Sequence, residues 1–156
     1  MKKNLRFEFP PSFDLCARGK DCSDSEEVRL AMSICRDTYL LNRTLVSDGY
    51  DDALAYLGRI MPFNLHRMKS GEQAWTWTVP KKWTVRRAAI YAAEQCICDA
   101  AAHPLLLSSY SIPFSGTLSK RELLEHIVTD PDRPQAIPYH YHYYKADWSF
   151  CLPFSR

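Results

Sequence analysis

The residues best placed to do chemistry are two histidines, His140 and His142, separated by a single residue near the end of the sequence. In an extended strand both imidazoles would lie on one face, about 6 to 7 Å apart along the chain, where they could share a metal ion. A zinc site needs at least a third protein ligand. Asp147, Cys151 and His126 are possible ligands, but none lies at a recognised spacing. We therefore expect an exposed or partner-facing histidine pair rather than a metal site.

An aromatic stretch at residues 75–83 contains three of the four tryptophans of the chain. Its apolar side chains alternate with threonines up to Pro80, which is the pattern of a half-buried strand followed by a break. We favour a packed β core, and the alternative is an aromatic face that binds a ligand or a partner. The side chains considered for such contacts are Trp75, Trp77, Trp83 and Tyr144.

Four basic residues, Lys81, Lys82, Arg86 and Arg87, surround Trp83. Basic and aromatic side chains together can neutralise phosphates and stack on bases. In a strand, however, Arg86 and Arg87 would point to opposite faces, and the net charge of the whole chain is only +2. We do not expect nucleic-acid binding.

Familiar catalytic motifs are missing from the sequence. There is no G-x-S-x-G elbow, Walker loop, G-x-G-x-x-G fingerprint or H-E-x-x-H pair. The acidic residues of the predicted helices are explained by ordinary solvated charge. We therefore predict no catalytic residue within these 156 positions.

The six cysteines lack the spacing of a metal or redox motif, since the only close pair, Cys96 and Cys98, is not C-x-x-C. Cys35 falls within an apolar helical stripe, so we expect it in the core. No export signal is evident, and we expect cytoplasmic thiols. The six are Cys16, Cys22, Cys35, Cys96, Cys98 and Cys151.

Length and composition are those of a soluble globular protein. The chain has 156 residues, of which 46% are hydrophobic and 24% charged. No window approaches 18 consecutive apolar residues, so we expect no membrane-spanning helix. The N-terminal residues are basic but lack the apolar run of a signal peptide, and residues 1–22 are predicted to be an irregular lead-in.

Three helices are predicted from capping residues and apolar periodicity. Ser23 or Asp24 could cap the first, whose stripe includes Val28, Ala31, Ile34, Cys35 and Tyr39. Residues 47–49 open the second, which Pro62 ends. Ser119 and Glu122 form a capping box for a short third helix.

Strands are predicted at residues 63–68, 75–79, 83–92, 105–112 and 139–144. In the last of these, Tyr139, Tyr141 and Tyr143 should share one face, and His140, His142 and Tyr144 the other. The expected fold class is α+β: two N-terminal amphipathic helices followed by a mostly antiparallel β-rich domain with one short helix.

Five tracts of the sequence together resemble a known family. They are 46–50 (VSDGY), 75–83 (WTWTVPKKW), 109–114 (SYSIPF), 136–139 (AIPY) and 143–151 (YYKADWSFC). In their order and spacing the chain resembles the N-terminal part of bacterial aminopeptidase-like proteins related to the di-zinc exopeptidases. The resemblance covers roughly residues 26–153.

The resemblance implies that residues 23–68 begin an aminopeptidase-like domain, 69–138 form an inserted β-rich domain of unknown function, and 139–156 return toward the catalytic part. It also implies zinc in complete family members, where a metal-activated water would attack a peptide or amide bond. The family's metal ligands match no position here, and His140 and His142 match no family metal motif. Residues 92–102 depart from the family because alanines and two cysteines replace a polar hairpin.

The leading functional hypothesis is an N-terminal fragment of an aminopeptidase-like zinc hydrolase, without activity on its own and without a cofactor in this chain. Its expected partner is the missing catalytic part or another subunit. The alternative is a stand-alone module whose aromatic β surface binds a sugar, a peptide or a partner. A nucleic-acid module ranks third.

Overall fold

The computed structural model describes residues 25–154, which fall into two compact units that divide between Tyr39 and Leu40. In the first unit, α1 (Glu26–Thr38) begins at Ser25, whose hydroxyl oxygen accepts a hydrogen bond from the Val28 amide at 3.2 Å. Ser25 is therefore the N-cap in place of the predicted residues. Glu26 and Glu27 in the first turn and Arg36 in the last suit the helix dipole. The prediction of a helix here is confirmed, but Cys35 is exposed rather than buried.

The second unit opens with α2 (Asp48–Ile60), which confirms the second predicted helix. The Ser47 hydroxyl accepts a hydrogen bond from the Tyr50 amide at 3.2 Å and donates one to the Thr44 carbonyl at 2.6 Å. Gly49 is required because a Cβ at this position would collide with the Asn42 carbonyl oxygen. The start of α2 is thus fixed against the loop that precedes it.

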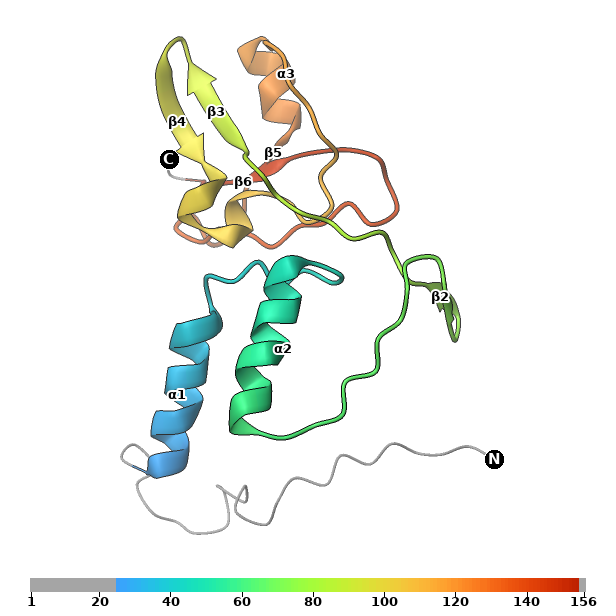
Figure 1. The fold of residues 1–156 in the computed structure, drawn as a ribbon. Helices are drawn as coiled ribbons and strands as arrows, with labels where there is room; N and C mark the ends of the chain where they lie inside the picture. Colours follow the sequence, from blue (N-terminus) through green and yellow to red (C-terminus); the bar gives the residue numbers. More distant parts are fainter. Residues whose placement is uncertain (1–24, 155–156) are drawn as a thin grey trace. The chain divides into compact units, whose positions relative to one another are not determined.

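The described residues hold three small sheets of two strands each (Figure 1). The antiparallel pairs are β1 (Gln73–Ala74) with β2 (Trp77–Thr78), and β3 (Ala89–Ala92) with β4 (Gln95–Asp99). The third pair, β5 (Ile127–Val128) with β6 (Phe150–Cys151), is parallel. The fold is α+β, but its strand content is low, so the prediction of a β-rich domain is wrong.

The tryptophan stretch forms a hairpin rather than a half-buried strand. Residues 75 and 76 make its two-residue turn, and Trp75 has a φ of 53°. Left-handed dihedrals match the twist of a tight hairpin, and alternation alone does not reveal them. Trp75 and Trp77 are consequently 91% and 44% exposed, and the prediction that they form a packed core is wrong.

Three further predicted strands are missing, and one of them is residues 139–144, where only Tyr141 takes part in an isolated bridge. Residues 61–68 are all exposed and carry no helix or strand. In place of the strand predicted at residues 105–112, the structure has the 3₁₀ helix η4 (Pro104–Leu106) and two isolated bridges. The bridges join Leu107 to Phe150 and Ser109 to Tyr141. In each case the residues favour an extended backbone but find no continuous partner strand.

Residues 89–99 form a hairpin, whose turn and second strand lie in the segment 92–102 that departs from the resembled family. β3 pairs with β4 through a shifted register between Ile90 and Tyr91, and the 3₁₀ helix η3 (Ala100–Ala102) follows. Ile90 and Cys98 face each other across the ladder and are both buried. Strand structure in the predicted segment 83–92 is limited to β3.

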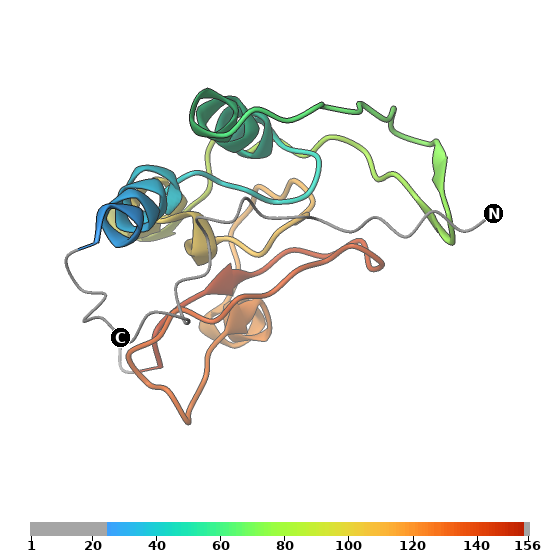
Figure 2. The ribbon, with the colours of Figure 1, turned by 90° about the horizontal axis from the view of Figure 1, so that it is seen from below.

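The buried core of the second unit gathers residues far apart in sequence. Ile90, Cys98, Leu106 and Phe150 form its centre. β5 and β6 lie beside α3 (Lys120–Glu125), as Figures 1 and 2 both show. The predicted capping box is confirmed, because the Glu122 carboxylate accepts a hydrogen bond from the Ser119 amide at 2.8 Å.

No disulfide joins any two of the four cysteines within residues 25–154, and Cys16 and Cys22 lie outside the described part. Among the helices that the structure describes, none combines the length and the apolar character needed to cross a membrane.

Candidate functional site

A buried cluster of serines, histidines and one cysteine surrounds Ser108. The Ser108 hydroxyl lies 2.6 Å from the Ser149 hydroxyl, 3.3 Å from the Cys151 sulfur and 3.2 Å from Nδ1 of His140. Nε2 of His142 lies 2.9 Å from the Ser149 hydroxyl. The two predicted histidines therefore come together, with ring centroids 4.7 Å apart.

Burial argues that this cluster is structural. Ser108 and Cys151 are 1% and 0% exposed, so a substrate has no access to either atom. Burial also raises the pKa of the Cys151 thiol, which disfavours the reactive thiolate. A serine nucleophile needs a histidine base that a third group orients, and His140 does lie 3.2 Å from Ser108, but among the described residues no such group is hydrogen-bonded to the other ring nitrogen of His140. The cluster joins the loop 107–111 to residues 140–151.

The residues present do not fit a zinc ion. No group of three or more His, Cys, Asp or Glu residues in the described part of the chain could hold a metal. One ring nitrogen of His140 and one of His142 lie against serine hydroxyls, which are not among the usual zinc ligands. His126 and Asp147, two further candidates, instead contact each other at 3.5 Å.

Stability should depend on pH through His142. Burial lowers the pKa of this imidazole below its ordinary value of 6.5, and His140 lowers the pKa further, while Asp147 acts in the opposite direction. His142 binds a proton more readily in the unfolded state than in the folded state. Its contribution to the free energy of unfolding is therefore fully present above pH 6.5 and is lost as the pH drops through the folded-state pKa. Urea unfolding at several pH values measures this fall.

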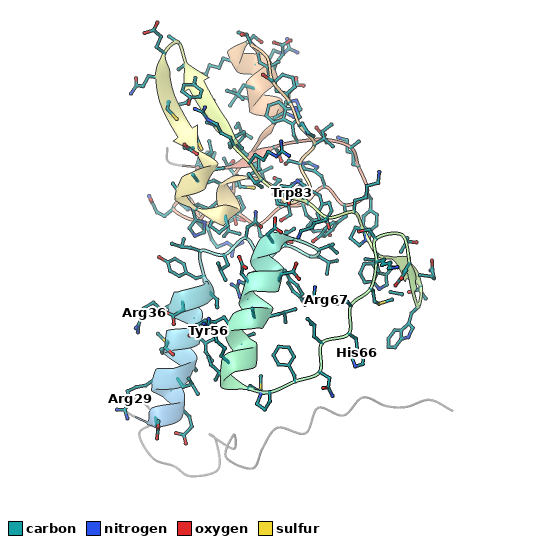
Figure 3. All side chains as sticks on the ribbon, in the orientation of Figure 1. Arg29, Arg36, Tyr56, His66, Arg67 and Trp83 are labelled. Carbon is teal, nitrogen blue, oxygen red and sulfur yellow. The ribbon has the colours of Figure 1, made fainter. Side chains whose placement is uncertain are left out.

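In His142→Gln the fall in stability between pH 7 and pH 5 should be smaller than in the unchanged protein. His66→Gln provides the matched control, because His66 lies on the exposed segment after α2 (Figure 3). Equal pH dependence in the two variants would contradict this role of His142.

Tyrosine rings form a second cluster, and it confirms part of the predicted alternation. Ring centroids of Tyr139 and Tyr141 lie 6.0 Å apart, those of Tyr141 and Tyr143 4.8 Å, and those of Tyr143 and Tyr110 4.7 Å. Tyr139 and Tyr141 are 60% and 46% exposed. Burial and the neighbouring Tyr139 raise the pKa of Tyr143 to about 12.

The four aromatic residues predicted to make contacts have different environments. Trp83 lies beside the start of α2 (Figure 3), and its amide donates to the Val46 carbonyl at 3.0 Å. Its indole nitrogen donates to the Ser111 carbonyl at 3.0 Å, and its ring stacks on Tyr110 at 5.9 Å. Tyr144 is 95% exposed and lies next to Tyr143. Trp83 is therefore a packing residue, whereas Trp75, Trp77 and Tyr144 are free to make contacts.

The basic stretch is split by ion pairs. Lys82 pairs with Asp48 and lies 3.6 Å from Asp51, both on α2. The lysine lowers the pKa of Asp48, and Asp48 in turn raises the pKa of Lys82. Only part of the predicted basic surface therefore remains without a neighbouring carboxylate.

A groove of about 1000 Å³ lies between residues 83–91 and 111–118. Arg86, Arg87, Phe114 and Trp148 are among the residues that line it. The sequence suggested Arg86 and Arg87 only as part of a nucleic-acid-binding surface. It did not predict that Phe114 lies near them. The adjacent arginines were the one local sign of an anion-binding site. The aromatic residues beside them in the groove, Phe114 and Trp148, are distant in the sequence.

Comparisons with known proteins give related matches. Residues 82–156 match the family described as "Domain of unknown function (DUF2172)". A "Putative polysaccharide biosynthesis protein with aminopeptidase-like domain" from Clostridium acetobutylicum is 28% identical over 121 residues, which are 77% of this chain and 28% of that protein. The crystal structure of a "putative peptidase" from Clostridium acetobutylicum matches with a TM-score of 0.78 and 27% identity, over 85% of this chain and 32% of that one. The chain thus spans less than a third of the length of either relative.

Proposed function

This chain carries a DUF2172 domain at residues 82–156 and is homologous to one portion of aminopeptidase-like proteins, and from this premise we propose that it is the framework and accessory part of an aminopeptidase-like zinc hydrolase. In this proposal zinc and the catalytic residues belong to another part of the protein or to another subunit. The described residues alone are inactive. Residues 23–68 supply the helical start, 69–138 the inserted domain and 139–156 the return to the catalytic part, and the protein works in the cytoplasm.

The observation that carries the proposal is the exposed apolar segment at residues 60–77. Single exposed apolar side chains are ordinary, but a concentration of them indicates an interaction surface. Each of its large apolar side chains is at least 37% exposed. They are Ile60, Met61, Phe63, Leu65, Met68, Trp75 and Trp77.

Local hydrogen bonds hold this segment in place. The Gly71 amide donates to the Val79 carbonyl at 2.9 Å, and the Val79 amide donates to the Glu72 carbonyl at 2.9 Å. Arg67 also lies 3.9 Å from Asp51 on α2. The hairpin is thus closed by its own backbone, which leaves the tryptophan side chains available to a partner. Tryptophan is among the residues that most often dominate binding energy at interfaces.

The test is binding to an aminopeptidase-like catalytic part. This chain would be mixed with the Clostridium acetobutylicum relative from which the matched 121 residues have been removed, and the affinity measured by calorimetry. Replacing both Trp75 and Trp77 with alanine should weaken binding by about 30-fold or more, because a buried tryptophan anchor contributes about 2 kcal/mol or more.

Tyr144→Ala is the matched control, since Tyr144 is as exposed as Trp75 but lies outside the segment. It should leave the affinity unchanged. Zinc-dependent aminopeptidase activity from this chain alone, or equal binding by the tryptophan variants, would contradict the proposal.

The second candidate function is a stand-alone binding module. The exposed rings of Tyr139, Tyr141 and Tyr144 favour this function, because they are close together in the sequence and are not buried in the core. In this case Tyr144→Ala should abolish a ligand-induced change in tryptophan fluorescence, and no catalytic part should bind.

A further inference from the structure

The groove between residues 83–91 and 111–118 falls entirely within the residues that match the domain of unknown function. Its volume of about 1000 Å³ is at the upper end of the range found for small-molecule sites. It is separate from the apolar segment at residues 60–77, on which the proposed framework role depends. A ligand of this groove would therefore be a second property of the chain.

The groove is positively charged. Arg86 and Arg87 line it, and its lining contains no aspartate or glutamate. Neither arginine forms an ion pair with any residue that the structure describes, whereas Lys82, Arg133 and Lys145 all do. The Arg87 guanidinium lies 5.9 Å from the centre of the Tyr91 ring and hydrogen-bonds to its hydroxyl. An anionic ligand would therefore neutralise a charge that the protein leaves uncompensated.

One wall of the groove is aromatic and held rigidly. Phe114 stacks on Trp148 with ring centroids 4.7 Å apart and planes inclined by 14°. His126 also stacks on Trp148, with ring centroids 4.0 Å apart, and its Nδ1 lies 2.8 Å from the Trp148 carbonyl oxygen. Since Phe114 remains 50% exposed, its ring can also contact an apolar ligand surface.

Hydroxyl groups complete the lining. Thr84, Ser115 and Thr117 are exposed residues of the groove. Ser115 and Thr117 can each donate and accept a hydrogen bond, whereas the Thr84 hydroxyl already donates to the Asp48 carboxylate at 3.0 Å and can only accept one. The groove therefore combines guanidinium groups, an aromatic face and several neutral hydrogen-bonding groups.

We propose that this groove binds a sugar unit that carries a carboxylate. Guanidinium groups match the planar carboxylate with paired hydrogen bonds. The C–H face of a pyranose ring suits the negative face of an aromatic ring, and its hydroxyls suit serine and threonine. A neutral sugar would leave the arginines without a counter-charge, and a simple anion would leave the aromatic wall without contact.

The test is titration of the 156-residue chain with glucuronic acid at neutral pH, measured by calorimetry and by the fluorescence of Trp83 and Trp148. Glucose is the neutral control ligand. Glucuronate should bind about tenfold or more tightly than glucose, and Arg86→Gln or Arg87→Gln should each weaken its binding by about tenfold, as expected for a lost charge-assisted hydrogen bond. Phe114→Ala should weaken the binding of both sugars.

Arg121→Gln is the matched control variant, because Arg121 is an exposed arginine of α3 outside the lining. It should leave the affinity unchanged. Equal affinities for glucuronate and glucose, or unchanged binding in both groove arginine variants, would overturn the proposal.

Two further ligands test the chemical class. Glucose 1-phosphate binding in place of glucuronate would overturn the carboxylate assignment, and a dipeptide with a free C-terminus binding in its place would overturn the sugar assignment. The titrations involve no catalytic part and no zinc, so their outcome is independent of the proposed framework role.

Discussion

Replacing Phe150 with alanine is expected to lower the free energy of unfolding by about 3 to 5 kcal/mol, the usual cost of removing a buried aromatic side chain. Phe150 is 5% exposed and packs with Ile90, Cys98 and Leu106 at the centre of the core. Its amide donates to the His126 carbonyl at 2.9 Å, which attaches β6 to the end of α3. The cavity left by alanine would therefore lie where several segments meet.

Chemical denaturation of the unchanged chain and the variant measures this loss. Phe154→Ala is the matched control, because Phe154 is 57% exposed and should change stability by no more than about 0.5 kcal/mol. Equal losses in the two phenylalanine variants would show that the core is not organised around Phe150.

Ser108→Ala should have the second largest effect, a loss of about 2 to 3 kcal/mol, because it removes the shared partner of several buried polar groups. Without this hydroxyl, the Ser149 hydroxyl, the Cys151 sulfur and Nδ1 of His140 each lose a hydrogen-bonding neighbour. The site is too well enclosed for water to replace it freely, since Ser108 is 1% exposed.

Ser115→Ala, at an exposed serine, should leave the free energy of unfolding unchanged within about 0.5 kcal/mol. The same comparison tests whether the cluster is structural. A stable Ser108→Ala protein that lost an enzymatic activity would contradict the structural role assigned here.

Helices were predictable because their signals are local. Ser47 and Ser119 each accept a hydrogen bond from an amide three residues later, and such caps are visible in the sequence. The position of the first cap differs from the prediction because several neighbouring serines and acids could serve, and Ser25 is the one that does.

Strands were less predictable because alternation records which side chains could share a face, and not whether a partner strand exists. The Trp75 stretch alternates perfectly, yet a left-handed residue turns it into a hairpin tip. Residues 139–144 alternate too, and here Tyr139, Tyr141 and Tyr143 gather apart from the two histidines as expected. Tyr144 does not join the histidines, since it lies next to Tyr143, and only a single bridge joins Tyr141 to Ser109. Apart from Tyr144, alternation in residues 139–144 did predict which side chains share a face, because this segment packs against the loop that contains Ser109.

The sequence by itself determined the helices, the tyrosine and histidine alternation near the C-terminal end and the family resemblance, because caps, parity and the order of tracts are properties of neighbouring residues. Only the tertiary structure decided that Ser108 meets Ser149 and Cys151, which are 41 and 43 residues away. It also decided that Trp75 is exposed and that Arg86 and Arg87 share a groove with Phe114 and Trp148. These outcomes depend on how distant segments pack to bury apolar surface and satisfy buried polar groups, and no local pattern records that packing.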